Sequence, residues 1–306
     1  MPPLEPLLRR LLGGRVIKAA GGHGLPQDPE ERSTTAQDQR GLLVPVANPE
    51  GVAPLIAIAI AASEPGDPPP RVIALVRRRG GEPPGEPPAT PALSAAIEYA
   101  RAHGAAIEAQ AVWSGNPALD IVTTAQQARV AWVLLGYHRG APGDTMGGVV
   151  REVFARTKSL PINVAAFIQG TDRPFERVFA AADASPDGRA ALALASRIAR
   201  KNKCKLRALL VSNTVTQAHA DLPEAELVEM LHDARAAMGR LFHSDVLTQR
   251  SLNQLFKQTP GRLLIVGKKF ADEVGLPLDE VLGGDRCVIV VDGADPGVSK
   301  PARLTG

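Results

Sequence analysis

The chain has 306 residues, enough for about two domains of ordinary size. Its 44% hydrophobic and 22% charged residues are typical of a globular protein and exclude a disordered one. Lys and Arg outnumber Asp and Glu by only 35 to 32, so the net charge gives no indication of a nucleic-acid partner. The two cysteines, Cys204 and Cys287, form neither a CxxC pair nor a disulfide framework, which favours a reducing, cytoplasmic setting.

Residues 1–40 are predicted to be a basic amphipathic segment followed by a polar linker. Arg9 and Arg10 lie beside a helical stripe of leucines, and Gly13 ends the pattern. Three interpretations remain open: contact of residues 4–12 with a membrane surface, capping of a neighbouring domain, or an ordinary terminal helix. The stripe consists of Leu4, Leu7, Leu8, Leu11 and Leu12.

From residue 41 the apolar pattern alternates between strands and helices. The helices are expected at 51–63, 92–103 and 117–129, with a fourth that begins near 149 and ends before Pro161. Such alternation predicts a parallel, doubly wound sheet. The strands are expected at 42–46, 72–76, 106–113, 132–135 and 162–167.

The same alternation returns after residue 176, which predicts a tandem repeat with an offset of about 131–136 positions. We therefore expect an α/β protein with two tandem doubly wound parallel five-stranded sheets of order 3-2-1-4-5, in domains 41–170 and 177–293, with a tail at 294–306. The second set of strands is expected at 178–182, 206–211, 245–249, 263–266 and 288–291, and its helices at 186–201, 224–242 and 252–258.

A glycine-rich loop follows the fourth strand of the first half. Glycines recur between Gly136 and Gly148, and a helical pattern begins directly after them. Backbone N–H groups in such a loop and at a helix N-terminus attract anions, and His138 and Arg139 add further donors. Two interpretations stand at equal weight: a phosphate cradle and a tight turn.

Both halves resemble the universal stress protein domain. The residues that carry the resemblance are Gly136–Arg139, followed by 147–153, and the strand and helix of 178–192. The glycine loop is particularly similar to that in the cytoplasmic tails of bacterial monovalent cation/proton antiporters, which often hold two such domains. The resemblance implies a five-stranded α/β fold, an adenine-nucleotide site (ATP or AMP), an antiporter partner and a homodimer. It also implies that the two fifth strands face each other across a pseudo-twofold axis.

The nucleotide-binding members have the pattern Gly-x2-Gly-x9-Gly-(Ser/Thr) and an Asp at the end of strand one. This chain departs from both features: position 139 is Arg, Gly136 and Gly147 are 11 positions apart rather than 13, and Ala47 replaces the Asp. We nevertheless place the candidate nucleotide-binding residues at the matching positions. They are Ala47, Asn48, Gly136, His138, Arg139, Gly140, Gly147, Gly148 and Val149.

The second half has the complementary defect. Asp183 is present at the end of its first strand, but lysines rather than glycines follow Gly267. Alignment of the fifth strands places Asp272 and Glu273 at the positions of Gly147 and Gly148, where they would repel a phosphate. Asp183 and Gly267 are therefore predicted to belong to a vestigial site.

No catalytic or metal-binding motif is present. The six histidines lack HExxH spacing, and GxSxG, Walker and GxGxxG motifs are absent. We expect no metal and no enzyme, with weak ATP hydrolysis left open. The leading hypothesis is a cytoplasmic regulatory module of a cation/proton antiporter at the inner face of the cell membrane. The alternatives are a structural or dimerisation module that binds nothing, and a stand-alone tandem universal stress protein in the stress response.

Overall fold

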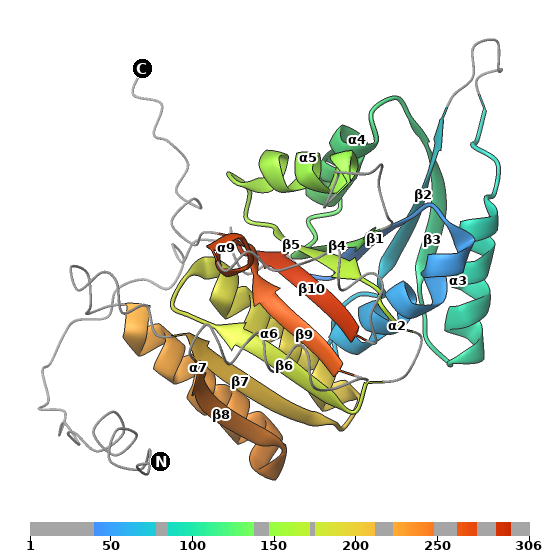
Figure 1. The fold of residues 1–306 in the computed structure, drawn as a ribbon. Coiled ribbons are helices and arrows are strands. Elements are labelled where there is room, and N and C mark those ends of the chain that lie inside the picture. The colour runs from blue at the N-terminus through green and yellow to red at the C-terminus, as the bar shows by residue number, and fades with distance from the viewer. Residues whose placement is uncertain are drawn as a thin grey trace, which may run out of the picture. The chain divides into compact units, whose positions relative to one another are not determined.

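A computed structural model describes residues 40–77, 85–137, 147–171, 175–211, 223–247, 262–273 and 286–294 (Figure 1). The leucine stripe of residues 4–12, the helix expected at 252–258 and the tail after Ala294 lie outside these residues. No helix in the described parts of the chain is both long and apolar enough to cross a bilayer.

The first half follows the strand–helix alternation expected from its sequence. Thr90 and Asn116 begin two of its helices: their side chains accept hydrogen bonds from the N–H groups of Leu93 and Leu119 (3.2 and 3.1 Å), and a proline follows each cap. The elements are β1 (Leu42–Val46), the 3-10 turn η2 (Pro49–Gly51), α2 (Val52–Ala62), β2 (Arg71–Arg77), α3 (Pro91–Ala102), β3 (Glu108–Ser114), α4 (Pro117–Gln127), β4 (Trp132–Tyr137), α5 (Gly148–Thr157) and β5 (Asn163–Ile168).

The described parts of the second half follow the same alternation, with differences from the expected boundaries and an additional short helix after β9. Its second helix ends at Met238 rather than at Phe242, because Gly239 adopts a left-handed conformation (φ 53°) that turns the chain toward the next strand. The next strand therefore begins at Phe242, whereas the sequence predicted its start at 245. The elements are β6 (Arg177–Ala182), α6 (Pro186–Lys201), β7 (Lys205–Val211), α7 (Pro223–Met238), η3 (Gly239–Leu241), β8 (Phe242–Leu247), β9 (Arg262–Gly267), α9 (Lys268–Glu273) and β10 (Arg286–Asp292).

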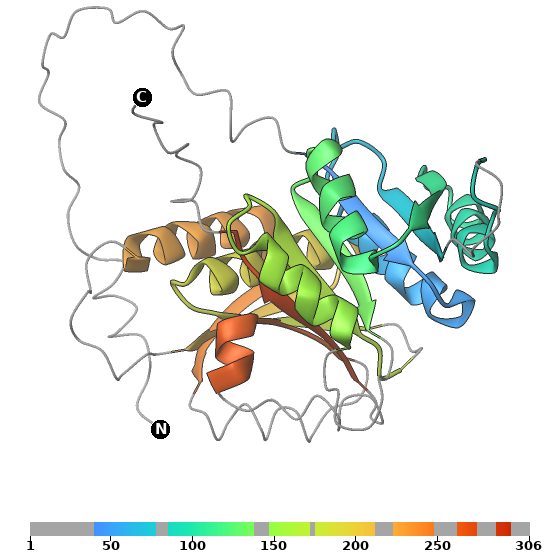
Figure 2. The same cartoon turned by 90° about the horizontal axis from the view of Figure 1, so that it is seen from above.

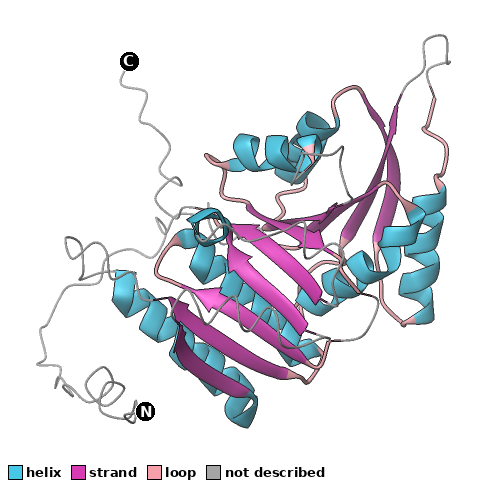
Figure 3. Cartoon of the chain, in the orientation of Figure 1, coloured by secondary structure: helices cyan, strands magenta, loops and turns pink. Residues whose placement is uncertain are grey.

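The strand order confirms the predicted fold class. Neighbouring strands follow the order β3-β2-β1-β4-β5-β10-β9-β6-β7-β8, so each half is a parallel unit of order 3-2-1-4-5 (Figures 1 and 3). The two fifth strands lie side by side, as expected, and they pair antiparallel, with Ile289 opposite Phe167 and Asp292 opposite Val164. The two five-stranded units thus form one continuous ten-stranded sheet, with helices on both of its faces (Figure 2). We call the pairing of β5 (Asn163–Ile168) with β10 (Arg286–Asp292) the seam.

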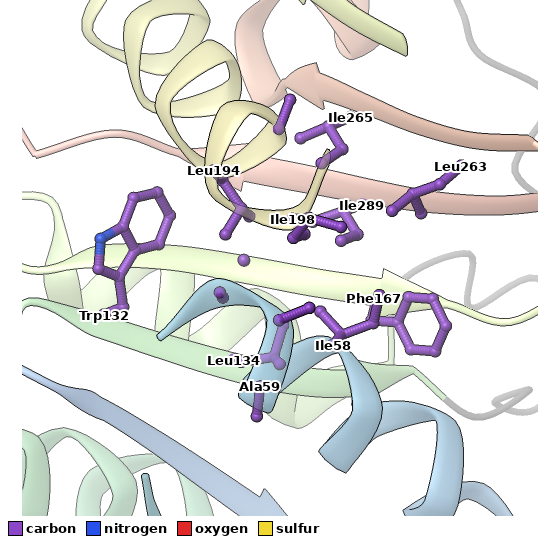
Figure 4. Close-up of a cluster of buried hydrophobic side chains, with 14 of the residues drawn as sticks. Ile58, Ala59, Trp132, Leu134, Phe167, Leu194, Ile198, Leu263, Ile265 and Ile289 are labelled. Carbon is purple, nitrogen blue, oxygen red and sulfur yellow. The ribbon is translucent and has the colours of Figure 1, made fainter. Parts of the chain in front are cut away.

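The core runs across the seam. On one face, α2 of the first half packs against α6 of the second, over side chains of β4, β5, β9 and β10 (Figure 4). This neighbour explains why α2 is apolar on nearly all sides. Glu64, just beyond α2, also forms ion pairs with Arg197 and Arg200 of α6 (3.5 and 2.5 Å). The labelled side chains in Figure 4 are Ile58, Ala59, Trp132, Leu134, Phe167, Leu194, Ile198, Leu263, Ile265 and Ile289.

Because the core is shared, a cavity in one half should destabilise the other. Ile198 of α6 is fully buried, and we expect Ile198→Ala to lower the free energy of unfolding by about 2–5 kcal/mol. Both tryptophans, Trp113 and Trp132, lie in the first half, so their fluorescence in a urea titration reports whether that half unfolds with the second.

The matched control is Ile97→Ala on α3, where the isoleucine is 38% exposed and little change is expected. An unchanged tryptophan transition in Ile198→Ala would show that the halves unfold independently.

Candidate functional site

A cleft of about 370 Å³ lies at the carboxyl ends of β1 and β4. β1 pairs with β2 on one side and with β4 on the other, so the chain leaves these two strands in opposite directions and opens a crevice between them. Its size falls in the range of ligand pockets, roughly 300–1,000 Å³. The lining residues are Pro45, Val46, Ala47, Asn48, Gly51, Val52, Leu55, Leu75, Pro117, Ile121, Leu135, Gly136, Tyr137, Gly147, Gly148, Val149 and Val150.

The turn after β1 forms one wall of this cleft. Asn48 has an extended backbone, and its Oδ1 accepts a hydrogen bond from the N–H group of Glu50 (3.2 Å), which caps η2. The asparagine therefore holds the turn with its oxygen, and the NH₂ donors of its amide remain at the rim. Gly51 follows and lines the cleft without a side chain.

The N-terminus of α5 forms the opposite wall. Gly147 precedes this helix with φ 65°, a left-handed conformation that a residue with a Cβ rarely adopts. No side chain of the described residues caps the helix, and its first turn contains no acidic residue. The first N–H groups of α5 are therefore not satisfied by a capping side chain, and the helix dipole adds positive potential at the same place. A methyl group added at Gly148 would meet no described atom within 4 Å.

Six of the candidate nucleotide-binding residues line this one cleft: Ala47, Asn48, Gly136, Gly147, Gly148 and Val149. The other three, His138, Arg139 and Gly140, lie outside the described residues. Leu75, Ile121 and Tyr137 supply apolar walls of the cleft and were not among the residues predicted from the sequence. Leu75 lies near the end of the strand beside β1, so the predicted strand order was the signal that could have identified it.

The predicted residues of the second half make a different arrangement. Asp183 follows β6 and is 9% exposed, and its Oδ1 accepts hydrogen bonds from the backbone N–H group (2.8 Å) and the hydroxyl group of Ser185. Ser185 in turn caps α6 by accepting a bond from the N–H group of Gly188 (3.1 Å). Asp183 therefore stabilises the start of α6.

The first turn of α6 occupies the space at the ends of β9 and β10. A Cβ at Gly267 would lie 2.8 Å from Asp187 Cβ, and a Cβ at Gly293 would lie 2.2 Å from the carbonyl oxygen of Pro186. The Asp187 carboxylate accepts hydrogen bonds from the N–H groups of Lys269 (3.0 Å) and Gly293 (2.9 Å). Asp187 is the fifth residue after β6, as Gly51 is the fifth after β1, so a carboxylate takes the position that is empty in the first half.

The proposed acidic replacement of the glycines is therefore wrong. Helix α9 begins at Lys268, directly after β9, so Asp272 and Glu273 lie at its end and not at its N-terminus. Asp272 forms an ion pair with Lys268 one turn earlier (2.5 Å). A carboxylate does reach the ends of these strands, but it is that of Asp187, which is 82 and 106 positions away in sequence from Lys269 and Gly293. Among the described residues, no three His, Cys, Asp or Glu side chains gather in a way that could hold a metal ion.

The fold of the chain is similar to that of a protein of known structure. No protein-family model and no curated protein sequence matches the chain. The cytoplasmic domain of a prokaryotic cation chloride cotransporter is 16% identical over 86% of this chain and 97% of that one, with a TM-score of 0.52. A universal stress protein from Archaeoglobus fulgidus DSM 4304 is 15% identical over 84% of this chain and 98% of that one, with a TM-score of 0.49. At 16% identity the likeness to the cotransporter domain shows the fold alone, and this fold is the one expected from the sequence.

The N-termini of α5 and α6 are packed differently. A methyl group added at the start of α6 should therefore lower the stability of the fold, whereas one added at the start of α5 should change it little. In Gly188→Ala the new Cβ would lie 2.2 Å from Asp183 Oδ1 and 2.6 Å from the backbone nitrogen of Asp183, so the turn after β6 must shift. We expect a loss of about 1–3 kcal/mol in the free energy of unfolding. Gly148→Ala is the matched control, because its Cβ meets nothing within 4 Å. Equal stabilities of the two variants in a urea titration would contradict the close packing of α6.

Proposed function

We propose that the chain is a cytoplasmic regulatory module of a cation/proton antiporter that senses an adenine nucleotide or a related anion in the first-half cleft. The observation that carries the proposal is the cleft itself, where apolar walls meet a helix N-terminus that has no acidic first turn and no capping side chain among the described residues. Such an N-terminus is a favourable place for a phosphate group.

The two kinds of wall suit the two parts of a nucleotide. Leu75 and Ile121 offer apolar surface for a base, while the N–H groups near Gly147 and Gly148 face the space in which a phosphate would lie. The NH₂ group of Asn48 would donate a hydrogen bond to an oxyanion, because the side-chain oxygen already caps η2. The residues present thus fit a phosphorylated ligand with an apolar portion.

Ribose recognition is the weaker part of this fit. The nucleotide-binding members of the resembled family carry an Asp where this chain has Ala47, so no carboxylate receives the ribose hydroxyls at that position. We therefore expect modest affinity for ATP or AMP, or a preference for a different anion. His138 and Arg139 are proposed to contribute charge from the loop that precedes α5.

We propose binding rather than catalysis. None of the described lining residues of the cleft is a carboxylate, a histidine, a serine or a cysteine, so the described cleft supplies no nucleophile and no general base other than Tyr137. Phosphate release under excess ATP tests for residual hydrolysis.

The link to a transporter is supported by the similar structure, which is the cytoplasmic domain of a cation chloride cotransporter. We propose that this chain likewise serves a membrane transport domain, with residues 4–12 near the inner membrane surface. A homodimer would need a surface other than the fifth strands, because β5 and β10 already pair within one chain.

A structural module that binds nothing is the second candidate. One observation favours it: in the second half, the Asp187 carboxylate accepts hydrogen bonds from the N–H groups of Lys269 and Gly293, at the ends of β9 and β10. A thermal-shift panel of nucleotides separates the two candidates, because a ligand that binds only the folded state raises the melting temperature.

Placing a carboxylate in the first cleft should imitate the second half. Gly51 has φ −91°, which other residues adopt freely, so Gly51→Asp should fold while its charge repels phosphate. We expect affinity for ATP or AMP in calorimetric titration to fall about ten-fold or more. Gly85→Asp makes the same charge change at a glycine that does not line the cleft, and its affinity should match that of the wild type.

The loop cation provides a second and independent prediction. Arg139→Ala should weaken binding of ATP or AMP by about ten-fold or more, because a charge-assisted hydrogen bond is lost. Asp183→Ala should leave the affinity almost unchanged, since Asp183 holds the turn before α6. Full affinity in Arg139→Ala, together with loss of binding in Asp183→Ala, would show that the second half carries the site.

A further inference from the structure

Asp187 ties the start of α6 to the ends of two strands. Its Oδ2 accepts the hydrogen bond from Lys269, which follows β9, and its Oδ1 accepts the bond from Gly293, which follows β10. The carboxylate also lies in the first turn of a helix, where the dipole favours negative charge. The ionised form of Asp187 is therefore the form that holds these three elements together.

Asp292 ends β10 directly before Gly293 and lies beside this carboxylate. Its Oδ2 is buried, and no described group donates a hydrogen bond to that atom. Burial and the negative charge of Asp187 raise the pKa of Asp292 from 3.8 to about 6, against the opposing effect of Lys268 and Lys158. Asp292 is thus poised to take up a proton just below neutral pH.

We propose that Asp187 and Asp292 form a proton-binding site, and that protonation of Asp292 tightens the attachment of α6 to the ends of β9 and β10. One proton moves from solvent to the carboxylate of Asp292. The resulting hydroxyl group donates a hydrogen bond to the Asp187 carboxylate, which keeps both of its backbone partners. When Asp292 loses this proton, two negative charges lie side by side, and their repulsion weakens the hydrogen bond that the N–H group of Gly293 donates to Asp187.

The site connects to the first half through the seam. Asp292 pairs with Val164 of β5, and the N–H group of Ala294 donates to Oδ1 of Asn163 (2.9 Å), which is the first residue of β5. Charged groups reach Asp292 from each neighbouring helix: Asp187 from α6, Lys268 from the start of α9 and Lys158 from the end of α5. Protonation of Asp292 therefore changes the electrostatic interactions of groups in both halves, independently of any ligand in the first-half cleft.

The effect on stability has a definite sign. The folded chain holds the proton on Asp292 up to about pH 6, whereas an ordinary Asp releases it near 3.8. Between these values the folded state binds more protons than the unfolded state, so the contribution of Asp292 to stability falls as pH rises through this window.

Carbon-13 NMR of the aspartate carboxyl groups tests the site directly. The Asp292 signal should titrate near 6 in the wild type, and its midpoint should fall by about one unit in Asp187→Asn, while burial keeps it above the ordinary value. Asp120→Asn is the matched control, because Asp120 also lies half-buried in the first turn of a helix and accepts two hydrogen bonds, but in the first half. An unchanged Asp292 midpoint in Asp187→Asn would overturn the proposal.

Amide hydrogen exchange tests whether protonation of Asp292 strengthens the attachment of α6 to the ends of β9 and β10. After correction for intrinsic rates, Lys269 and Gly293 of the wild type should be better protected at about pH 5 than at about pH 7.5. Asp292→Asn carries no charge at either pH, so its protection should stay at the low-pH level of the wild type throughout, while Asp120→Asn should retain the pH dependence. Protection of Lys269 and Gly293 that does not change with pH in the wild type would also overturn the proposal.

Discussion

The antiparallel pairing of β5 with β10 is the interaction on which the rest of the structure depends. A parallel five-stranded unit leaves its fifth strand with a row of unpaired N–H and C=O groups, and both of these strands are buried and apolar. Pairing them satisfies both rows at once. Because the strands run in opposite directions, the end of β10 lies beside the start of β5. The carboxyl ends of the two halves therefore open at opposite edges of one sheet.

The seam also decides which helices meet. It brings α2 and α6 together on one face, which buries the apolar surface of α2 and places Glu64 between two arginines of α6. Each of these two helices thus buries apolar surface against the other half. The two repeats therefore share one hydrophobic core, and the structure gains cohesion from contacts that a single domain of this fold would have to find in a partner chain.

The same fold is used differently in the two halves. At the fifth position after the first strand, one half has Gly51 and an open cleft, and the other has Asp187 and a carboxylate bonded to two backbone N–H groups. Close approach of α6 to β9 and β10 requires glycine at 267 and 293, where a side chain would collide with the helix. One carboxylate and two glycines thus make a structural contact at the place where the first half has its cleft.

The sequence by itself determined the strands, most helix boundaries and the strand order, because these follow from local periodicity, caps such as Thr90 and Asn116, and the handedness of crossovers. It also identified six of the residues that line the cleft at the ends of β1 and β4. Only the tertiary structure decided that the two units share one sheet and that Asp187 closes the second half. The partners of Asp187 are 82 and 106 positions away in the chain. A pattern read along the sequence reports neighbours in sequence, whereas hydrogen bonds and packing across the seam depend on neighbours in space.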